Sequence, residues 1–164
     1  MSNTLDEIDA KLLDLVQQDA GLSVAELAER VGLSSSPCWR RIKRMEEQGI
    51  ITKRVTLLDR ESIGLNFQAF ASIKLTLPTP QNLEAFEAAV QDMPEVVECA
   101  TVTGHVDYVL MIIASDMRAY DRFLRQKILG TGLVSDVQSR IVIRAVKSTT
   151  ALPLNLVSPY VEGD

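Results

Sequence analysis

A short turn followed by a basic helix, VGLSSSPCWRRIKRMEEQG from Val31 to Gly49, constrains this chain more than any other feature. Ser34 is placed to cap the helix with its hydroxyl, and Pro37 falls in the first turn, where a missing N–H costs little. Gly49 can adopt the positive φ that ends a helix. At about 100° per residue, one face of this helix is apolar and the opposite face is basic. We therefore expect a DNA recognition helix.

The apolar seam of this helix consists of Cys38, Ile42 and Met45. The residues expected to contact DNA are Ser34, Ser35, Ser36, Pro37, Arg40, Arg41, Lys43 and Arg44. Arg40 is the first candidate for reading a base edge, because its guanidinium fork matches O6 and N7 of guanine. Lys43 and Arg44, with Lys53 and Arg54 further on, are expected to hold phosphates. The alternative is that this charge run is only a solvated helix face.

The net charge of −5 is distributed unevenly along the chain. Residues 1–29 contain seven acidic residues and one basic residue, whereas residues 34–54 contain six basic and two acidic ones. Attraction to phosphate is screened over about 8–10 Å, so the local excess matters more than the total. An acidic remainder argues against indiscriminate coating of nucleic acid and favours one docking face. No apolar run is long enough for a membrane helix, and the N-terminus lacks a signal-peptide pattern, so we expect a cytoplasmic protein.

Two shorter helices are expected before the basic one. LDEIDAKLLDLVQQ (5–18) places Leu5, Ile8, Leu12 and Leu15 at helical spacing. Ser23 and Glu26 form a capping box that begins a second helix, over residues 24–30. Three short helices, the last two joined by a tight turn with a glycine, are typical of a helix-turn-helix.

The rest of the chain alternates between strand and helix patterns. IITKRVTLLD (50–59) is rich in β-branched residues and is expected to be a strand, either a wing or a connector. The elements expected after it are strand 67–77, helix 82–93, strands 96–104 and 107–114, a helix over 117–129 and a last strand 134–147. The order βαββαβ is that of a ferredoxin-like domain. We therefore predict an α+β chain with a helix-turn-helix domain (1–49), a linker (50–66), a ferredoxin-like domain (67–147) and a C-terminal tail (148–164).

Two motifs of this chain resemble those of the Lrp/AsnC family of transcription factors that respond to amino acids, and they stand in the order and at the separation found in that family. The first is LDEIDAKLLDLVQQDAGLSVAELAERVGLSSSPCWRRIKRMEEQGII, and the second is VTGHVDYVL followed by DMRAYDRFL and the last strand. The resemblance covers nearly the whole chain. It implies a winged helix-turn-helix joined to a ferredoxin-like ligand-sensing domain. It also implies homodimers formed mainly through the second domain, often assembled into octamers.

The resemblance also implies an effector site near the turn that contains Gly104, at the contact between dimers. Exposed amides in a tight turn can hold the carboxylate of an amino acid, and Asp107 can hold its ammonium group. The residues expected at this site are Thr101, Thr103, Gly104, His105, Asp107, Tyr108, Met117, Ile141 and Val142. The alternative is a simple hairpin with a local aspartate cap.

Three single residues have simpler interpretations. Trp39, the only tryptophan, is expected to be partly buried between the basic helix and the first helix rather than in contact with DNA. Cys38 is expected to be a small buried hydrophobe, since apolar burial raises the pKa of a thiol. His105 is expected to be a surface histidine and not a metal ligand, because no partner lies at ligand spacing.

The function predicted is an amino-acid-responsive regulator that binds double-stranded DNA. A symmetric dimer would present two recognition helices to successive major grooves, and Thr149, Thr150 and Leu152 could contribute to the contact between dimers. An enzyme is disfavoured, because there is no phosphate-binding loop, dinucleotide fingerprint or metal cluster, and no cofactor is implied. An architectural oligomer that wraps DNA with modest sequence preference stays open as the alternative.

Overall fold

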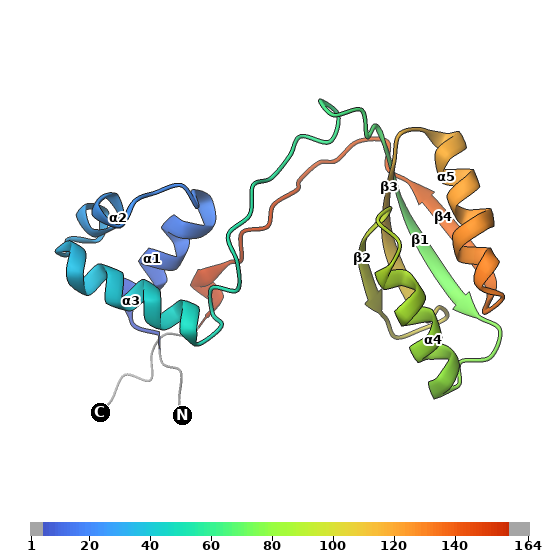
Figure 1. Cartoon of the computed structure of the whole chain (residues 1–164), viewed down its shortest axis with the longest axis horizontal. Helices are drawn as coiled ribbons and strands as arrows, with labels where there is room; N and C mark the ends of the chain where they lie inside the picture. Colours follow the sequence, from blue (N-terminus) through green and yellow to red (C-terminus); the bar gives the residue numbers. More distant parts are fainter. Residues whose placement is uncertain (1–4, 158–164) are drawn as a thin grey trace. The chain divides into compact units, whose positions relative to one another are not determined.

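The computed structural model describes residues 5–157, which divide into two compact units (Figure 1). Residues up to Leu57, together with those from Lys147 onward, form the first unit, and residues 58–146 form the second. The segment after Lys147, which sequence alone places in a separate tail, therefore belongs by its contacts to the first unit. The chain leaves this unit once and returns to it.

The first unit contains the three predicted helices: α1 (Glu7–Gln18), α2 (Val24–Val31) and α3 (Ser35–Glu47). Both α1 and α2 begin with a capping box, made by Asp6 with Asp9 and by Ser23 with Glu26. In each box two unpaired first-turn donors are satisfied reciprocally. The buried core of the unit is Leu12, Leu13, Val16, Leu22, Leu27, Ala28, Cys38, Ile42 and Met45.

The buried face of α1 differs from the predicted one. Leu12 is buried as expected, but Leu13 and Val16 are buried in place of Ile8 and Leu15, which are only half-buried. The reason is that α1 contacts both α2 and α3, so its buried stripe is wider than a single-partner helix requires. Asp9 lies within this stripe and is 1% exposed.

The second unit has the predicted ferredoxin-like order. Its elements are β1 (Phe67–Leu75), α4 (Pro80–Gln91), β2 (Val96–Thr101), β3 (Tyr108–Ala114), α5 (Met117–Phe123) and β4 (Val134–Ile141). The sheet order is β2-β3-β1-β4, and every neighbouring pair is antiparallel. One sheet face packs against the two helices through Phe86, Val90, Tyr120 and Phe123. No helix of this unit covers the other face, where Phe70 is 39% exposed.

Three predicted elements differ in extent. Residues 52–59 are extended but carry no strand pairing, because no neighbouring strand completes a ladder with them. The last strand ends at Ile141 rather than at residue 147, since Ile141 pairs with Ala69 and the chain beyond Val142 runs past the start of β1. The helix predicted over 117–129 is α5 followed by a π-helical turn, Leu124–Ile128, and a 3-10 turn, Leu129–Thr131.

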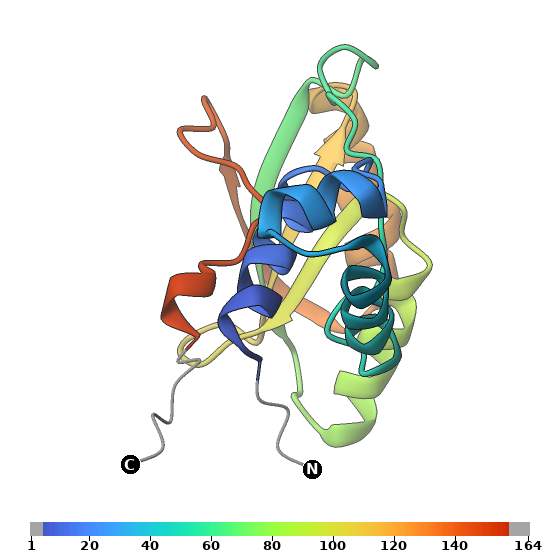
Figure 2. The same ribbon diagram turned by 90° about the vertical axis from the view of Figure 1, so that its left-hand side faces the viewer.

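The C-terminal segment lies beside α1, as Figures 1 and 2 both show for the short 3-10 helix Leu154–Leu156. The Gln17 side chain donates to the Leu152 carbonyl at 3.0 Å and accepts from the Leu152 N–H at 2.9 Å. Leu154 packs on the core of the first unit. A single side chain thus makes the two hydrogen bonds that a neighbouring strand would make. Within residues 5–157, no helix is long and apolar enough to cross a membrane.

Candidate nucleic-acid interface

The turn between α2 and α3 is fixed by one glycine. Gly32 has φ +71°, a backbone conformation that a side chain would strain, and its N–H bonds back to Glu29 at 3.2 Å. The Leu33 N–H bonds to the Ala28 carbonyl at 2.8 Å, which closes the C-terminal end of α2. Because α3 starts at Ser35, the connection is short and forces the chain to change direction sharply. This is the geometry of a helix-turn-helix.

The seam of α3 is buried as predicted. Cys38 and Met45 are fully buried, and Ile42 is 4% exposed. Cys38 is a small core hydrophobe as predicted, and its burial raises the pKa of the thiol. Gly49 has φ +71° just after the helix, as expected. Ser34 occupies the N-cap position, but its hydroxyl makes no capping hydrogen bond, so that part of the prediction is wrong.

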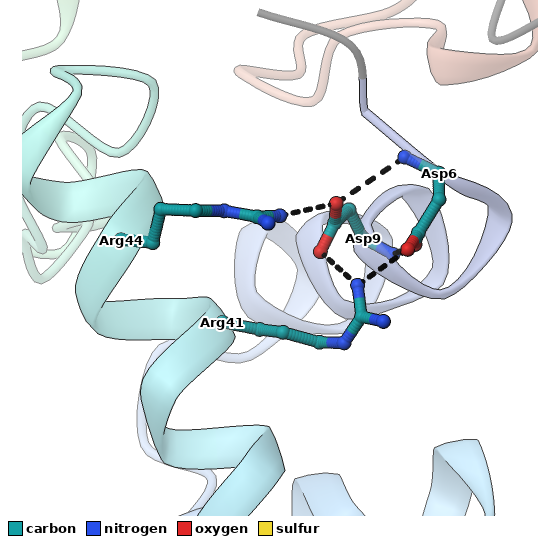
Figure 3. Close-up of polar contacts among 4 residues, drawn as sticks. All are labelled: Asp6, Asp9, Arg41 and Arg44. Carbon is teal, nitrogen blue, oxygen red and sulfur yellow. Dashed lines mark hydrogen bonds and ion pairs between the residues drawn. The ribbon is translucent and has the colours of Figure 1, made fainter.

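Two arginines of α3 are held by carboxylates of α1 (Figure 3). The Arg41 guanidinium donates from Nη1 to Asp6 Oδ2 at 2.6 Å and to Asp9 Oδ1 at 2.8 Å. Arg44 donates to the other oxygen of Asp9. Asp9 also accepts the Asp6 backbone N–H at 3.2 Å. A buried carboxylate with three donors is fully compensated, so this cluster fixes the rotation of α3 against α1.

The Asp6 carboxyl is stabilised in its charged form. Partial burial opposes its ionisation, but the hydrogen bonds from the Asp9 N–H and the Arg41 guanidinium outweigh burial and lower the pKa of Asp6 below its ordinary value. The same pairing raises the pKa of Arg41. The Asp6–Arg41 pair is therefore charged on both sides at neutral pH.

Sequence reasoning missed this cluster. Its hydrogen-bonded aspartate–arginine pairs lie 32 to 35 residues apart in the chain, so no local spacing connects the two helices. A signal was nevertheless present, because Asp9 interrupts the apolar stripe Leu5–Leu12–Val16 of an amphipathic helix. A carboxylate at such a position needs a cationic partner from another element.

The rest of the polar face of α3 is open to solvent. Arg40, Lys43, Ser35 and Ser36 are all exposed, and Pro37 is half-buried. No hydrogen bond or ion pair within residues 5–157 holds the Arg40 side chain. Lys43 has only a long contact of 3.9 Å with Glu47, one turn further along. Arg40 and Lys43 are thus available to an external anion.

Trp39 is 53% exposed, so the prediction that it is wedged against α1 is wrong. The physical reason is helical phase. Relative to Cys38, Arg41 lies about 60° round the helix on one side, and Trp39 lies about 100° round on the other. Because α1 holds the side that carries Arg41, Trp39 faces away from α1.

The two basic residues after α3 are placed differently from each other. Arg54 lies 3.4 Å from Glu46 and 3.5 Å from the Ala20 carbonyl, which ties the extended segment to α3 and to the end of α1. Lys53 is exposed and, in the part of the chain that the structure describes, forms no ion pair. Lys53 is the better placed of the two to meet a phosphate.

In the second unit, the β2–β3 turn is attached to the end of β1. The Asp107 carboxylate accepts the Leu75 N–H at 2.7 Å, and the Asp107 N–H donates to the Ile73 carbonyl at 2.9 Å. Lys74 donates to the His105 carbonyl at 2.9 Å. Gly104 has φ +120° and sits at the exposed tip, beside Thr103 and His105. Asp107 therefore holds the turn in place with one oxygen of the carboxylate that was expected to bind an ammonium group.

A cavity of about 270 Å³ lies next to this turn, between α4 and strands β2 and β3. Its lining residues are Glu87, Val90, Gln91, Cys99, Thr101 and Tyr108. The Tyr108 hydroxyl donates to Glu87 Oε1 at 2.8 Å, and burial together with this carboxylate raises the pKa of Tyr108. Glu87 was not predicted as a site residue, because its charge looks like part of an ordinary exposed helix face. The cavity combines an apolar wall with a carboxylate and two hydroxyls.

The nine predicted effector residues fall into two groups. Thr101, Thr103, Gly104, His105, Asp107 and Tyr108 lie at one end of the sheet. Met117, Ile141 and Val142 lie at the other end, as the register Phe67↔Ala114, Ala69↔Ile141 and Ile73↔Tyr108 requires. Met117 and Ile141 are about half exposed. One chain does not bring the two groups together, so a site containing both needs residues from a second copy.

The fold and these surfaces define a protein with a DNA-binding helix-turn-helix unit and a separate ferredoxin-like unit with a small ligand-sized cavity. Two family models match the chain accordingly. Residues 5–52 match a winged helix-turn-helix DNA-binding domain, and residues 68–152 match the Lrp/AsnC ligand binding domain. The chain belongs to the Lrp/AsnC family, and it is a DNA-binding transcriptional regulator.

Individual relatives agree with this assignment. The DNA-binding transcriptional activator DecR of Escherichia coli K12 is 41% identical over 150 residues, which are 92% of this chain and 99% of that protein. The glutamate uptake regulatory protein of Zymomonas mobilis is 39% identical over 154 residues, covering 94% and 93% of the two chains. A transcriptional regulator from Neisseria meningitidis, solved as a complex with L-methionine, superposes with a TM-score of 0.90. It is 40% identical and covers 94% of this chain and 99% of that one.

Proposed function

We propose that this regulator places α3 in the major groove of its operator and controls genes for the metabolism or transport of an amino acid that it senses. The observation that carries the proposal is the division of the basic face of α3. Arg41 and Arg44 are held by α1, whereas Arg40 and Lys43 are exposed, and the one described contact between them and an acidic residue is the 3.9 Å pair of Lys43 with Glu47. The anchored pair fixes the helix, and the free pair is left for DNA. We propose that the protein is located in the cytoplasm, together with the DNA that it binds.

The proposed contacts follow from this division. Arg40 reads a base edge, and Lys43 holds a phosphate. The first-turn amides of Ser35 and Ser36, which have no intrahelical partner, face the phosphate backbone at the positive end of the helix dipole. Arg44 is still 44% exposed, so a phosphate can approach the side of its guanidinium that is turned away from Asp9. Arg41, at 26% exposed, acts through its position in the cluster.

A second copy of the chain completes the DNA-binding unit. The uncovered sheet face carries Phe70, which is opposite Met111 and Arg140 in the neighbouring strands. A face that combines exposed apolar side chains with a charged one, here Arg140 held by Ser72 at 2.9 Å, is a suitable surface for a homodimer. Two copies related by a two-fold axis would present two α3 helices to half-sites about one helical turn, roughly 34 Å, apart. Further assembly toward an octamer is part of the proposal.

The proposed effector site is the cavity that contains Thr101 and Tyr108, together with the adjoining turn. Glu87 supplies a carboxylate for an ammonium group, and the exposed turn amides near Gly104 can hold a carboxylate. The Neisseria relative, solved with L-methionine, supports an amino acid as the ligand class. Effector binding would change the packing of copies at this end of the sheet, and so the presentation of α3. That coupling requires different affinities of the effector for the two arrangements.

The experiment that tests the proposal begins with selection of duplexes from a random pool by the full-length protein. Footprints on a selected duplex are then recorded with and without each of the twenty amino acids. Discrete protection of two half-sites, altered by one or a few amino acids, is the expected result. Broad periodic coverage, unchanged by every amino acid, would contradict the sensor and support an architectural DNA-wrapping protein.

A further inference from the structure

One large apolar residue of α3 is more than half exposed. Trp39 is 53% exposed, and its ring contacts no other aromatic ring within residues 5–157. Tryptophan is enriched at binding surfaces, so a ring more than half exposed on an otherwise polar helix face is a candidate contact residue. The cost of its exposure is removed only when a partner covers it.

The surroundings of Trp39 identify that partner. On the helical wheel, Trp39 lies about 40° from Lys43, about 60° from Ser36 and about 100° from Arg40. All three neighbours are exposed and none of them is acidic; the acidic residue on the same stripe, Glu46, lies about two turns further on and is paired with Arg54 at 3.4 Å. Arg41 and Arg44, which α1 holds, lie on the opposite flank of this surface. In a chain with net charge −5, a ring beside Arg40, which holds no described partner, and Lys43, which has only a 3.9 Å contact with Glu47, fits a polyanion that also offers apolar groups.

We propose that Trp39 is a DNA-contacting residue that reads sequence through apolar contact, packing on a thymine methyl group and the adjoining sugar in the major groove. This inference rests on the proposed docking of α3. Thymine is the base that presents a methyl group in the major groove, so a ring at this position favours an A·T pair next to the base pair read by Arg40. Such a contact adds sequence preference without neutralising a phosphate.

The test uses the full-length protein, a duplex selected for wild-type binding and a scrambled duplex of equal length. Because Trp39 is the only tryptophan, its emission reports its own surroundings. We expect selected DNA to change the emission and to protect the ring from acrylamide quenching. We expect Trp39→Ala to weaken binding of the selected duplex about tenfold, with Trp39→Phe closer to wild type. The scrambled duplex should bind equally to all three proteins.

Salt dependence separates a base contact from a phosphate contact. Log Kd against log salt should have the same slope for Trp39→Ala and for wild type, because no phosphate contact is lost. Leu77→Ala, which changes a 62% exposed apolar residue of the other unit, is the matched control and should bind as wild type. Thermal unfolding of each variant shows that the fold is intact.

Four results would overturn the inference in different ways. Wild-type binding by Trp39→Ala, with unchanged emission, would remove Trp39 from the interface and leave the proposed function standing. Equal loss on both duplexes with a shallower salt slope would assign Trp39 to the backbone. Loss of binding with a changed sedimentation coefficient would assign it to a contact between copies. Failure to select any duplex would remove the proposed docking of α3 along with this inference.

Discussion

The buried carboxylate of Asp9 on α1 accepts a 2.8 Å hydrogen bond from the guanidinium of Arg41 on α3. With Arg44 on the other oxygen, this pair joins the first helix of the unit to its recognition helix. The rotation of α3, and therefore the set of side chains it offers to DNA, depends on this contact. The basic face of α3 thus has two parts. Arg41 and Arg44 hold the helix against α1, and Arg40 and Lys43 are the residues proposed to contact DNA.

Asp9→Asn is expected to lower the free energy of unfolding by about 1–3 kcal/mol, because it removes the buried negative charge and places an NH2 donor against a guanidinium in place of one acceptor oxygen, while Arg41 keeps its bond to Asp6. The arginines can turn toward water, which limits the loss. Urea unfolding measures it, with Asp14→Asn, an exposed carboxylate of the same helix, as the control. A variant as stable as the control would show that the cluster does not position α3.

Acid should weaken the first unit through Asp6. Its pKa is lower in the folded state, so its stabilising contribution is present above the ordinary carboxyl value of 3.8 and is lost as the pH falls through the lower folded value. Asp6→Asn is expected to flatten the dependence of stability on pH below that value. Unfolding followed between pH 5 and pH 2, a range chosen to be about one to two units on either side of the ordinary value, tests this. An unchanged pH profile would contradict the prediction.

The C-terminal segment should detach from α1 when the two hydrogen bonds between Gln17 and Leu152 are removed. Gln17→Ala deletes the acceptor of the Leu152 N–H, and we expect that amide to lose protection from hydrogen exchange. Gln18→Ala is the matched control, because among residues 5–157 the Gln18 side chain bonds only to Asp14 on its own helix. Retained protection at Leu152 in Gln17→Ala would mean that apolar packing of Leu154 is sufficient.

Glu87 should be needed for effector binding. An amino acid that binds the folded state raises the melting temperature, by the equivalent of about 2.7 kcal/mol at a hundredfold excess over Kd. We expect Glu87→Gln to lose this shift while remaining folded, because the amide keeps the hydrogen bond from Tyr108 but not the charge. A full shift in Glu87→Gln would place the effector elsewhere.

Local sequence patterns predicted most of the fold but only part of the interface. The apolar periods and the Ser23–Glu26 capping box identified the helices, because these signals lie within one turn of each other. The Asp9–Arg41 contact and the exposure of Trp39 could not be predicted in this way, since both depend on which flank of α3 meets α1. The predicted strand over 50–59 failed for a similar reason, because strand pairing needs a partner that the local sequence does not specify.

The lining of the cavity was likewise only partly predictable from local sequence. Thr101 and Tyr108 were predicted from the turn that they flank, whereas Glu87 comes from α4 and joins them only through the packing of that helix on the sheet. Met117, Ile141 and Val142 were grouped with them by resemblance, and the strand register places them at the other end of the sheet. Whether both groups contact one effector stays a prediction.

The measurement that tests the division of α3 most directly is the Kd of Arg40→Ala for a duplex selected by the wild-type protein. Arg125→Ala, which removes a 73% exposed arginine from the other unit, is its matched control. We predict that Arg40→Ala loses at least about tenfold in affinity with unchanged thermal stability, and that it relaxes selectivity at one base pair. Equal affinities of Arg40→Ala and Arg125→Ala would contradict the assignment of this face to DNA.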